Sequence, residues 1–285
     1  MSIAPSFVTP LRYPGGKGRL GAWLGKVIED NDLGNGYYVE PYAGGAGAAA
    51  FLLTNNFINK IVINDLDPAI YSFWHAVFED TESLIKLIHE TPVTIETWRA
   101  QKNTINTANQ VDTTALGFAA FFLNRTNRSG IIQGGVIGGK AQNGKYLIDA
   151  RYNKTNLIAR IEKLATLKER VKIHNLDAVD LIKIPEYNSN NSLIYLDPPY
   201  YNKGSQLYRN HYNPEDHSKI ADAAMKLKAP WIVTYDNCEQ IKELYAAANQ
   251  YEFSFRYSTH IKRPQAKEVM FFGNLKLNTA PTMRR

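Results

Sequence analysis

A short apolar run that ends in two prolines restricts the fold of this chain more than any other stretch. Residues 193–196 read Leu-Ile-Tyr-Leu, which is typical of a buried strand, and Asp197, Pro198, Pro199 and Tyr200 follow at once. Because two consecutive prolines fix φ twice and remove two N–H donors, neither a helix nor a strand ladder continues through them. The sequence therefore predicts a strand end that presents a carboxylate, a carbonyl in a fixed direction and an aromatic ring.

This strand end is a candidate site, because open α/β sheets place their chemistry at the carboxyl ends of their strands. Asp197 and the Pro198 carbonyl are two hydrogen-bond acceptors, and Tyr200 provides a flat face. The combination suits a planar ring that bears an amino group, since the acceptors bind the amine while the ring stacks on the tyrosine. The alternative is an acidic turn with Tyr200 packed as a lid.

Two earlier strands also end in residues suited to binding. Residues 37–39 predict the first central strand, and residues 40–47, Glu-Pro-Tyr-Ala-Gly-Gly-Ala-Gly, follow it. Glycines at such a turn let a ligand approach the backbone, although their spacing differs from G-x-G-x-x-G. Asp65 follows the strand expected at 60–63, where an acid typically binds ribose hydroxyls. A helix cap is the alternative for Asp65, but Asp67-Pro68 is the better candidate to start the next helix.

The N-terminal stretch 12–17, Arg-Tyr-Pro-Gly-Gly-Lys, predicts a turn that enters a helix containing Trp23, Leu24, Val27 and Ile28. Backbone N–H groups at such a turn can bind an anion. The stretch lacks the spacing of a nucleotide-binding P-loop.

The middle of the chain differs in charge and in pattern. Between Arg99 and Lys172 there are thirteen Lys/Arg and four Asp/Glu, a local charge of +9, while the whole chain carries +6. Helices are expected at 82–89, 113–123 and 154–167, with a glycine-rich hairpin or long ordered loop from about 124 to 146. Such a concentration of positive charge is typical of a polyanion-binding face. The alternatives are solvated helix faces and a flexible glycine loop.

Arg, Asn and Gln are the side chains that bind base edges with two hydrogen bonds, whereas Lys and Arg meet phosphates. The candidates for base edges in this segment are Arg125, Asn127, Arg128 and Gln133. The candidates for phosphates, chosen by charge alone, are Lys140, Lys145 and Arg151.

The rest of the chain returns to alternating strands and helices. Strands are expected at 171–174 and 231–235, helices at 178–182, 214–227 and 238–247, and an antiparallel pair at 253–257 and 269–272. Asp177 follows the first of these strands. The length of 285 residues allows one large α/β domain with an insertion or two modest domains.

Composition narrows the class of protein. The single cysteine, Cys238, excludes an internal disulfide and a multi-cysteine zinc site, and the six histidines show no metal-binding spacing. No apolar run reaches the length of a membrane span, and the first residues lack the apolar core of a signal peptide. A reducing cytoplasm is the expected compartment.

Taken in order, these motifs resemble those of the Dam-type DNA N6-adenine methyltransferases. Residues 12–17 resemble the family's N-terminal cofactor motif, 40–47 its methyl-donor loop, Asn64-Asp65 its acidic ribose motif, and 197–200 its catalytic tetrapeptide. The resemblance covers nearly the whole chain, and the order of motifs is that of the alpha-ordered group. The glycine pairs of the middle segment differ from the recognition segment of enzymes that methylate GATC.

The resemblance implies S-adenosylmethionine as cofactor and no metal. Lys17 and the glycine turns are then expected to receive the cofactor's carboxylate, Asp65 its ribose and Asp177 its adenine amino group. Asp197, Pro198, Pro199 and Tyr200 become the catalytic residues, and the target adenine must be flipped out of the duplex to reach them. The full set of expected cofactor-binding residues is Tyr13, Gly16, Lys17, Glu40, Tyr42, Gly44, Gly45, Gly47, Asp65 and Asp177.

We therefore expect a Rossmann-like α/β methyltransferase fold, formed by residues 1–79 and 169–285, with a mainly helical DNA-recognition domain inserted at 80–168. Double-stranded DNA is the expected partner, together with a cognate restriction endonuclease or another defence protein, and the protein is expected to be a monomer or weak dimer near the nucleoid. Other interpretations are an RNA adenine or protein glutamine methyltransferase, a catalytically inactive DNA-binding homologue, and a nucleotide-dependent dehydrogenase. Methyltransferases with RNA or protein substrates more often have Asn in place of Asp197, and the dehydrogenase disagrees with the glycine spacing.

Overall fold

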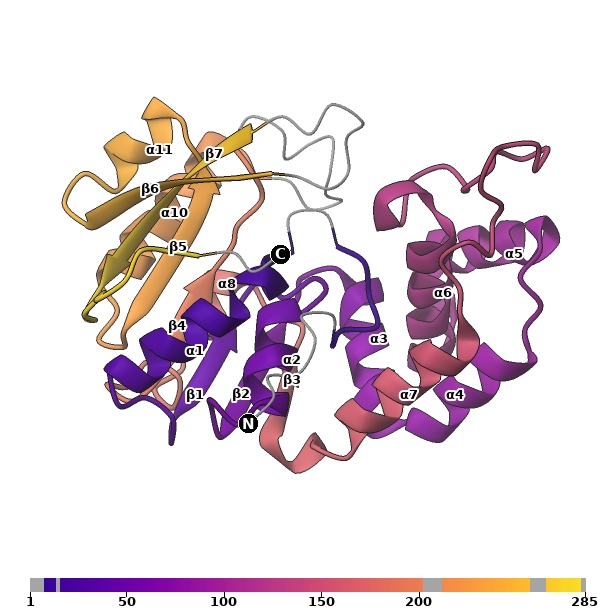
Figure 1. The fold of residues 1–285 in the computed structure, drawn as a ribbon, viewed down its shortest axis with the longest axis horizontal. Helices are drawn as coiled ribbons and strands as arrows, with labels where there is room; N and C mark the ends of the chain where they lie inside the picture. Colours follow the sequence, from indigo (N-terminus) through magenta and orange to yellow (C-terminus); the bar gives the residue numbers. More distant parts are fainter. Residues whose placement is uncertain (1–7, 14–15, 202–211, 257–264, 283–285) are drawn as a thin grey trace.

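The computed structural model describes residues 8–13, 16–201, 212–256 and 265–282, and within them one seven-stranded sheet is the centre of the fold (Figure 1). The strand order is β3-β2-β1-β4-β5-β7-β6. The strands are β1 (Tyr37–Glu40), β2 (Lys60–Asn64), β3 (Val171–His174), β4 (Leu193–Leu196), β5 (Trp231–Asp236), β6 (Asn249–Arg256) and β7 (Gln265–Gly273).

The first five strands are parallel, and β7 lies antiparallel between β5 and β6. Because parallel strands end at the same edge, the residues after β1, β2, β3, β4 and β5 are brought to one side of the sheet. This arrangement confirms the expected mixed, mostly parallel α/β fold with an antiparallel C-terminal pair. The pair is longer than the sequence predicted.

Helices cover both faces of the sheet, as a Rossmann-like fold requires. One apolar cluster joins the first face to α1 (Gly21–Asp30), α2 (Gly47–Thr54) and α3 (Pro68–Glu79). A second cluster joins the other face to α8 (Ala178–Ile182), α10 (Pro214–Met225) and α11 (Glu239–Leu244). Successive side chains of β1 point to opposite faces of the sheet, since Tyr38 belongs to the first cluster and Val39 to the second.

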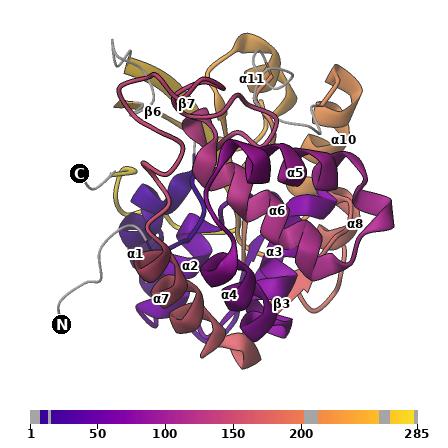
Figure 2. The ribbon, with the colours of Figure 1, turned by 90° about the vertical axis from the view of Figure 1, so that its right-hand side faces the viewer.

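A helical lobe stands beside the sheet and packs on α3 (Figures 1 and 2). It contains α4 (Thr81–Glu90), α5 (Ile95–Asn106), α6 (Thr113–Thr126) and α7 (Lys154–Ala165). The backbones of α6 and α3 nearly touch, because a Cβ at Gly117 would lie 2.4 Å from the Ser72 carbonyl oxygen. The sequence predicted three of these helices and missed α5. The apolar cluster of the first sheet face continues into the lobe, and the division into two domains remains a prediction.

The glycine-rich segment between α6 and α7 forms an ordered loop rather than a hairpin of two strands. An isolated bridge pairs Asn127 with Val136, and Gln142 ties the loop together. Its amide donates to the carbonyls of Ile137 and Gly139 and accepts from the Ile148 N–H.

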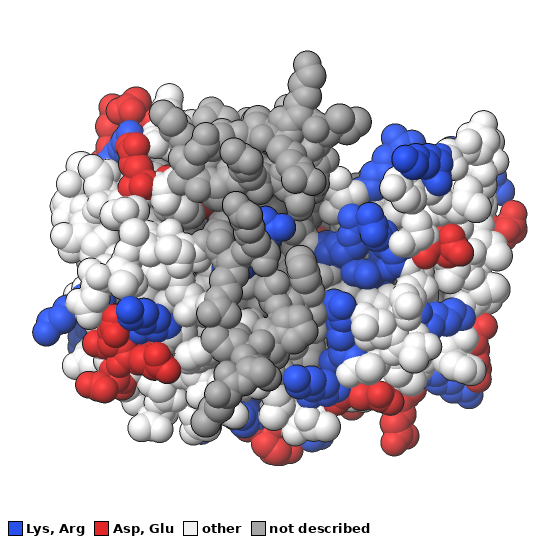
Figure 3. All heavy atoms as spheres, in the orientation of Figure 1, with Lys and Arg blue, Asp and Glu red and all other residues white. Residues whose placement is uncertain are grey.

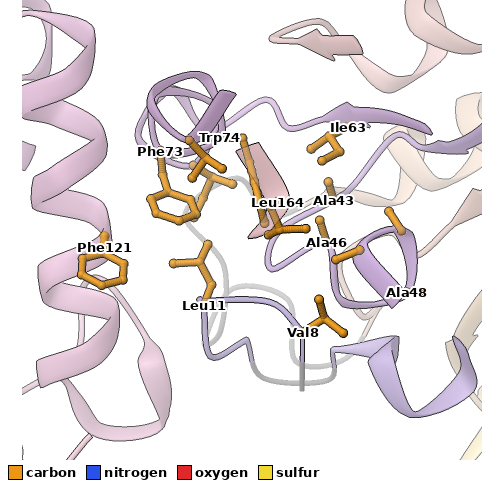
Figure 4. Close-up of a cluster of buried hydrophobic side chains, with 14 of the residues drawn as sticks. Val8, Leu11, Ala43, Ala46, Ala48, Ile63, Phe73, Trp74, Phe121 and Leu164 are labelled. Carbon is orange, nitrogen blue, oxygen red and sulfur yellow. The ribbon is translucent and has the colours of Figure 1, made fainter. Parts of the chain in front are cut away.

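The N-terminal segment 8–13 runs between the lobe and the sheet. Figure 4 shows Leu11 near Phe73 of α3, with Phe121 of α6 to the left of both. The rings of Phe73 and Phe121 are stacked, with their centroids 5.7 Å apart. Both backbone groups of Arg12 are bound by the Asn124 amide of α6, so the segment is fixed to the lobe.

Candidate functional site

The Asp197–Tyr200 tetrapeptide lies at the carboxyl end of β4, in the middle of the sheet. Asp197 is partly exposed, whereas Pro198, Pro199 and Tyr200 are buried. The Thr234 hydroxyl of β5 donates to Asp197 Oδ1 at 2.8 Å. The neighbouring strand therefore fixes the carboxylate in place at the end of β4.

Lys17 contacts the same carboxylate. Its Nζ lies 2.8 Å from Asp197 Oδ1 and 3.0 Å from Oδ2, and it also lies over the Tyr200 ring, 5.8 Å from the centroid. Burial by itself would lower the pKa of Lys17, but the charges of Asp197 and Glu268 outweigh it and raise the pKa well above its usual value. Lys17 is thus a buried cation at the candidate catalytic acid, where the sequence predicted a ligand's carboxylate as its partner.

Glu268 of β7 completes this cluster. Its Oε1 accepts a hydrogen bond from the Tyr200 hydroxyl at 2.8 Å and lies 3.6 Å from Lys17 Nζ. The sequence analysis missed both Glu268 and Thr234. A signal was present, since Glu268 directly precedes the apolar run Val-Met-Phe-Phe in a strand, where a buried acid requires a partner.

The glycine turn after β1 is filled by the chain's own N-terminal segment. A Cβ on Gly44, whose φ is +45°, would lie 2.6 Å from the Tyr13 ring, and one on Gly47 would lie 3.1 Å from the Gly18 Cα. Gly45 also faces Tyr13, with 3.0 Å between its hypothetical Cβ and the Tyr13 Cβ. The glycines are therefore needed for this close packing, where the sequence predicted the approach of a ligand.

Asp65 lies at the end of β2 and supports the same turn. Its Oδ2 accepts from the Gly44 N–H at 2.8 Å, and its Oδ1 accepts from the Asp67 N–H at 2.9 Å. Burial raises the pKa of Asp65 to about 7. Helix α3 is capped by Asp67, which accepts from the Ala69 N–H, as the sequence predicted. Each carboxylate oxygen of Asp65 has further lone pairs, so the residue can still accept a ligand hydroxyl.

Asp177 lies at the neighbouring end of β3 and is exposed, with Oδ1 accepting from the Val179 N–H at the start of α8. Two leucines, Leu66 and Leu176, lie beside the two acids and are 45% and 38% exposed. The Asn175 amide joins the two strand ends by donating to the carbonyls of Asp65 and Leu66. The edge thus offers two acids and two exposed apolar side chains, and the leucines were not among the expected site residues.

The other expected cofactor residues have structural partners. Glu40 is buried, and its Oε1 accepts from the Tyr38 hydroxyl and from the Ala49 N–H of α2. Burial raises the pKa of Glu40 to about 8. The Tyr42 hydroxyl lies 2.8 Å from that of Tyr212. Gly16 is exposed and donates its N–H to the Tyr13 carbonyl.

The position of Asn127 disagrees with the prediction that this side chain contacts a base edge. The side chain is fully buried, accepts from Trp98 Nε1 at 2.7 Å, and donates to the carbonyls of Ile131 and Ile132 at 2.9 and 2.8 Å. An amide held by three internal hydrogen bonds has no exposed edge for a base. The same chemistry that suits a base edge here holds the start of the glycine-rich loop.

The remaining candidates for DNA contacts are more accessible. Five of them are exposed on the loop: Arg128, Gln133, Lys140, Lys145 and Arg151. Figure 3 shows Lys and Arg side chains gathered along the border of the helical lobe with the rest of the molecule.

Arg125 lies among other arginines where α6 meets the N-terminal segment, since its Nη1 donates to the Pro10 carbonyl. It is half-buried and donates through Nε to the Arg151 carbonyl. Burial and the charges of Arg12, Arg160 and Arg151 lower the pKa of Arg125 to about 9. Among the described residues, none of these four arginines forms an ion pair with an acid, and the buried Nη1 of Arg12 has no hydrogen-bond partner. A cluster of this kind is suited to bind an anion.

Neither a metal site nor a membrane span is found in the part of the chain that the structure describes. No group of three or more His, Cys, Asp or Glu side chains there is arranged to hold a metal ion. No described helix is long and apolar enough to cross a membrane.

Several known proteins are similar to this chain. The Type II methyltransferase M.CviBI of Paramecium bursaria Chlorella virus NC1A is 23% identical over 229 residues, which cover 79% of this chain and 84% of the viral protein. Two solved structures are also similar to this chain, at low TM-scores. A proposed RNA methyltransferase of Pyrococcus horikoshii gives a TM-score of 0.42 at 10% identity, covering 92% of this chain and 84% of the other.

A SAM-dependent methyltransferase of Agrobacterium tumefaciens gives a TM-score of 0.39 at 10% identity, covering 90% of this chain and 61% of the other. At these scores the structural likeness carries no functional argument. The profile of the D12 class N6 adenine-specific DNA methyltransferases matches residues 13–266, which include the glycine turn after β1, Asp65 and the Asp197–Tyr200 tetrapeptide. The chain therefore belongs to the D12 class of N6 adenine-specific DNA methyltransferases.

Proposed function

We propose that this protein transfers a methyl group from S-adenosylmethionine to the N6 amino group of an adenine in double-stranded DNA, at a specific sequence. Membership of the family supports DNA methylation and S-adenosylmethionine as the cofactor. The observation that carries the proposal is the end of β4, where a fixed carboxylate, the Pro198 carbonyl and the Tyr200 ring lie together. That set matches a planar base with an exocyclic amine.

Two acceptors of this chain would make the N6 amine of the target adenine more reactive. The lone pair of that amine is delocalised into the ring, so the amine is a poor nucleophile. Asp197 and the Pro198 carbonyl would accept its two hydrogens and so favour a more tetrahedral, more nucleophilic nitrogen. As the N6–methyl bond forms and the bond between the methyl group and the sulfonium of the donor breaks, the amine must lose one proton, which Asp197 would be placed to accept. Since this contact cannot be made inside a duplex, the adenine must be flipped out.

The edge formed by β2 and β3 fits the cofactor. Asp65 would accept ribose hydroxyls with its remaining lone pairs, and Asp177 would accept from the adenine amino group. The exposed leucines Leu66 and Leu176 provide an apolar surface for a flat purine at the same edge. When bound, S-adenosylmethionine supplies a methyl group activated by a sulfonium.

The helical lobe would bind DNA. Exposed Arg128 and Gln133 are suited to base edges, and Lys140, Lys145 and Arg151 to phosphates. The arginines at the lobe border, Arg12, Arg125, Arg151 and Arg160, add a second place for backbone phosphates. Their mutual repulsion without acidic partners would be relieved by a bound anion.

Transfer of a labelled methyl group to DNA, RNA and protein is the test. We expect incorporation into DNA only, with N6-methyladenine as the product, and single-molecule sequencing of DNA from expressing cells would give the sequence context. Asp197→Ala should reduce the rate by roughly 10²–10³. Asp180→Asn, at an exposed position of α8, is the matched control and should act like the wild type. Labelled RNA, or an active Asp197→Ala enzyme, would refute the proposal.

A further inference from the structure

Lys17 occupies the position that the proposed chemistry gives to the target amine. Its ammonium is an N–H donor that binds both oxygens of Asp197, at 2.8 and 3.0 Å, and it lies over the face of Tyr200. An adenine amino group would need the same acceptor above the same ring. The ammonium must therefore give up at least part of its contact with Asp197 when the base enters.

A second acceptor for the ammonium lies next to it. Glu268 Oε1 is 3.6 Å from Lys17 Nζ, slightly beyond the N–H···O range of up to about 3.2 Å. The Lys17 and Glu268 side chains are 4% and 1% exposed, so water cannot take the place of a lost carboxylate partner. An ammonium that left Asp197 without another acceptor would be a buried, unpaired charge, which is strongly unfavourable.

The position of Glu268 is fixed from two sides. In the sheet, β7 lies between β5 and β6, and Glu268 is paired with Asp236 on one side and with Phe253 on the other. The same Oε1 accepts the Tyr200 hydroxyl. A carboxylate held in this way can receive a cation without moving the ring on which the base would stack.

We propose that Glu268 is a positioning residue for methyl transfer, which receives the Lys17 ammonium when the adenine amino group takes its place at Asp197 and which holds the Tyr200 ring throughout. The inference rests on the proposed function, because it assumes that Asp197 binds the amine. No covalent step is involved. Only the acceptor of Lys17 changes.

Glu268→Gln is the main test, since glutamine keeps the size and an oxygen for the Tyr200 hydroxyl but loses the charge that Lys17 requires. We expect the single-turnover rate on the cognate DNA to fall about tenfold, less than the loss expected for a group that touches the amine. Tyr200→Phe removes the hydroxyl contact and keeps the ring, so its single-turnover rate should fall clearly less than that of Glu268→Gln. An equal loss in Tyr200→Phe would mean that Glu268 acts only through the tyrosine, and the inference would be wrong.

A double-mutant cycle with Lys17→Met separates this role from a general structural one. Without an ammonium there is nothing for Glu268 to receive, so Glu268→Gln should cause no further loss in the Lys17→Met enzyme. Losses that multiply in the double variant would overturn the inference, as would wild-type turnover of Glu268→Gln. If Glu268→Gln does not fold, as judged by thermal unfolding, Glu268→Met takes its place, because it also removes the charge, and the cycle is run in the Tyr200→Phe enzyme so that the lost hydroxyl contact does not enter the comparison.

Base entry gives a readout that does not depend on turnover. In DNA with 2-aminopurine next to the target adenine, the fluorescence of the analogue increases when the adenine leaves the stack, and the target keeps the amino group that must displace Lys17. The increase should be smaller for Glu268→Gln than for the wild type, and it should be independent of Glu268 in the Lys17→Met background. A wild-type protein that methylates no DNA would refute the proposed function, whereas an active wild type matched by Glu268→Gln in both readouts would refute this inference alone.

Discussion

Replacing Asn127 by Ala tests whether its side-chain amide stabilises the fold or binds a DNA base. The change removes three hydrogen bonds, to Trp98 Nε1 and to the carbonyls of Ile131 and Ile132. Trp98 and Ile132 are 7% and 8% exposed, so water cannot replace their lost partner, whereas Ile131 is half-buried and can be partly solvated.

The magnitude follows from these contacts. Each hydrogen bond contributes about 1 kcal/mol, and each buried group left without a partner costs about 1–3 kcal/mol. With two buried groups and one half-buried group left, we expect the free energy of unfolding to decrease by about 3–5 kcal/mol. In a protein of this size the midpoint of thermal unfolding should then fall by about 6 °C or more.

Urea unfolding of Asn127→Ala, compared with Asn143→Ala, measures the effect. Asn143 is exposed in the same loop, and its replacement should change the unfolding free energy by less than about 0.5 kcal/mol. An Asn127→Ala protein as stable as the wild type, but with a relaxed choice of base at one position of the DNA site, would show that the amide reads DNA and that our description of its burial is wrong.

Three further results are expected. Burial raises the pKa of the Glu40 carboxyl from an ordinary 4.5 to about 8, so the folded state binds this proton more tightly than the unfolded state does. The free energy of unfolding of the wild type, relative to that of Glu40→Gln, should therefore fall by up to about 1.4 kcal/mol per pH unit as the pH rises from about 5 to 8. Urea unfolding of both proteins over this pH range measures the difference. Arg12→Gln should lower the salt dependence of DNA binding by roughly one unit of slope, whereas Arg170→Gln, whose guanidinium is bonded to carbonyl oxygens elsewhere, should leave the slope unchanged. Arg128→Ala should relax the choice at one base pair by about 1–3 kcal/mol, and Lys145→Ala should weaken binding to all sequences alike.

The strands of the sheet could be predicted because few other structures suit their sequences. Residues 193–196 and 231–235 are mainly apolar and end at prolines or polar residues, and this pattern favours a strand buried on both faces. Once parallel strands are assumed, topology brings Asp65 and Asp197 to the same edge. Local patterns therefore predicted both the architecture and the place of the candidate site.

Helix α5 was missed because it buries little. Trp98 and Ile105 are its only buried residues, and most of its other positions are polar, so the apolar spacing that identifies a helix is nearly absent. Its start did carry a signal, since Thr94 caps the helix by accepting from the Thr97 N–H. The helix is kept in place by packing against α6, which no local pattern reveals.

The contacts within the site could not be predicted, because they join residues far apart in the sequence. Lys17 and Asp197 are separated by 180 positions, and the choice of Lys17 between a cofactor's carboxylate and a protein carboxylate depends only on the folded geometry. Asn127 shows the same limit, because an amide that can bind a base edge can equally bind backbone carbonyls. Residue type indicates which interactions are possible, and packing decides which are made.

The N-terminal segment joins the parts of the molecule that the proposed function requires to work together. Leu11 packs at the junction of lobe and sheet, Arg12 is bound by Asn124 of the helical lobe, Tyr13 fills the glycine turn, and Lys17 contacts Asp197. A movement of the lobe on binding DNA must therefore be accommodated within a few residues of Lys17. Contact alone does not couple two sites, since coupling also requires an element with two discrete arrangements. The proposed exchange of the Lys17 ammonium between Asp197, at 2.8 Å, and Glu268, at 3.6 Å, would be such an element, and the segment that carries it is anchored to the lobe that would hold the DNA.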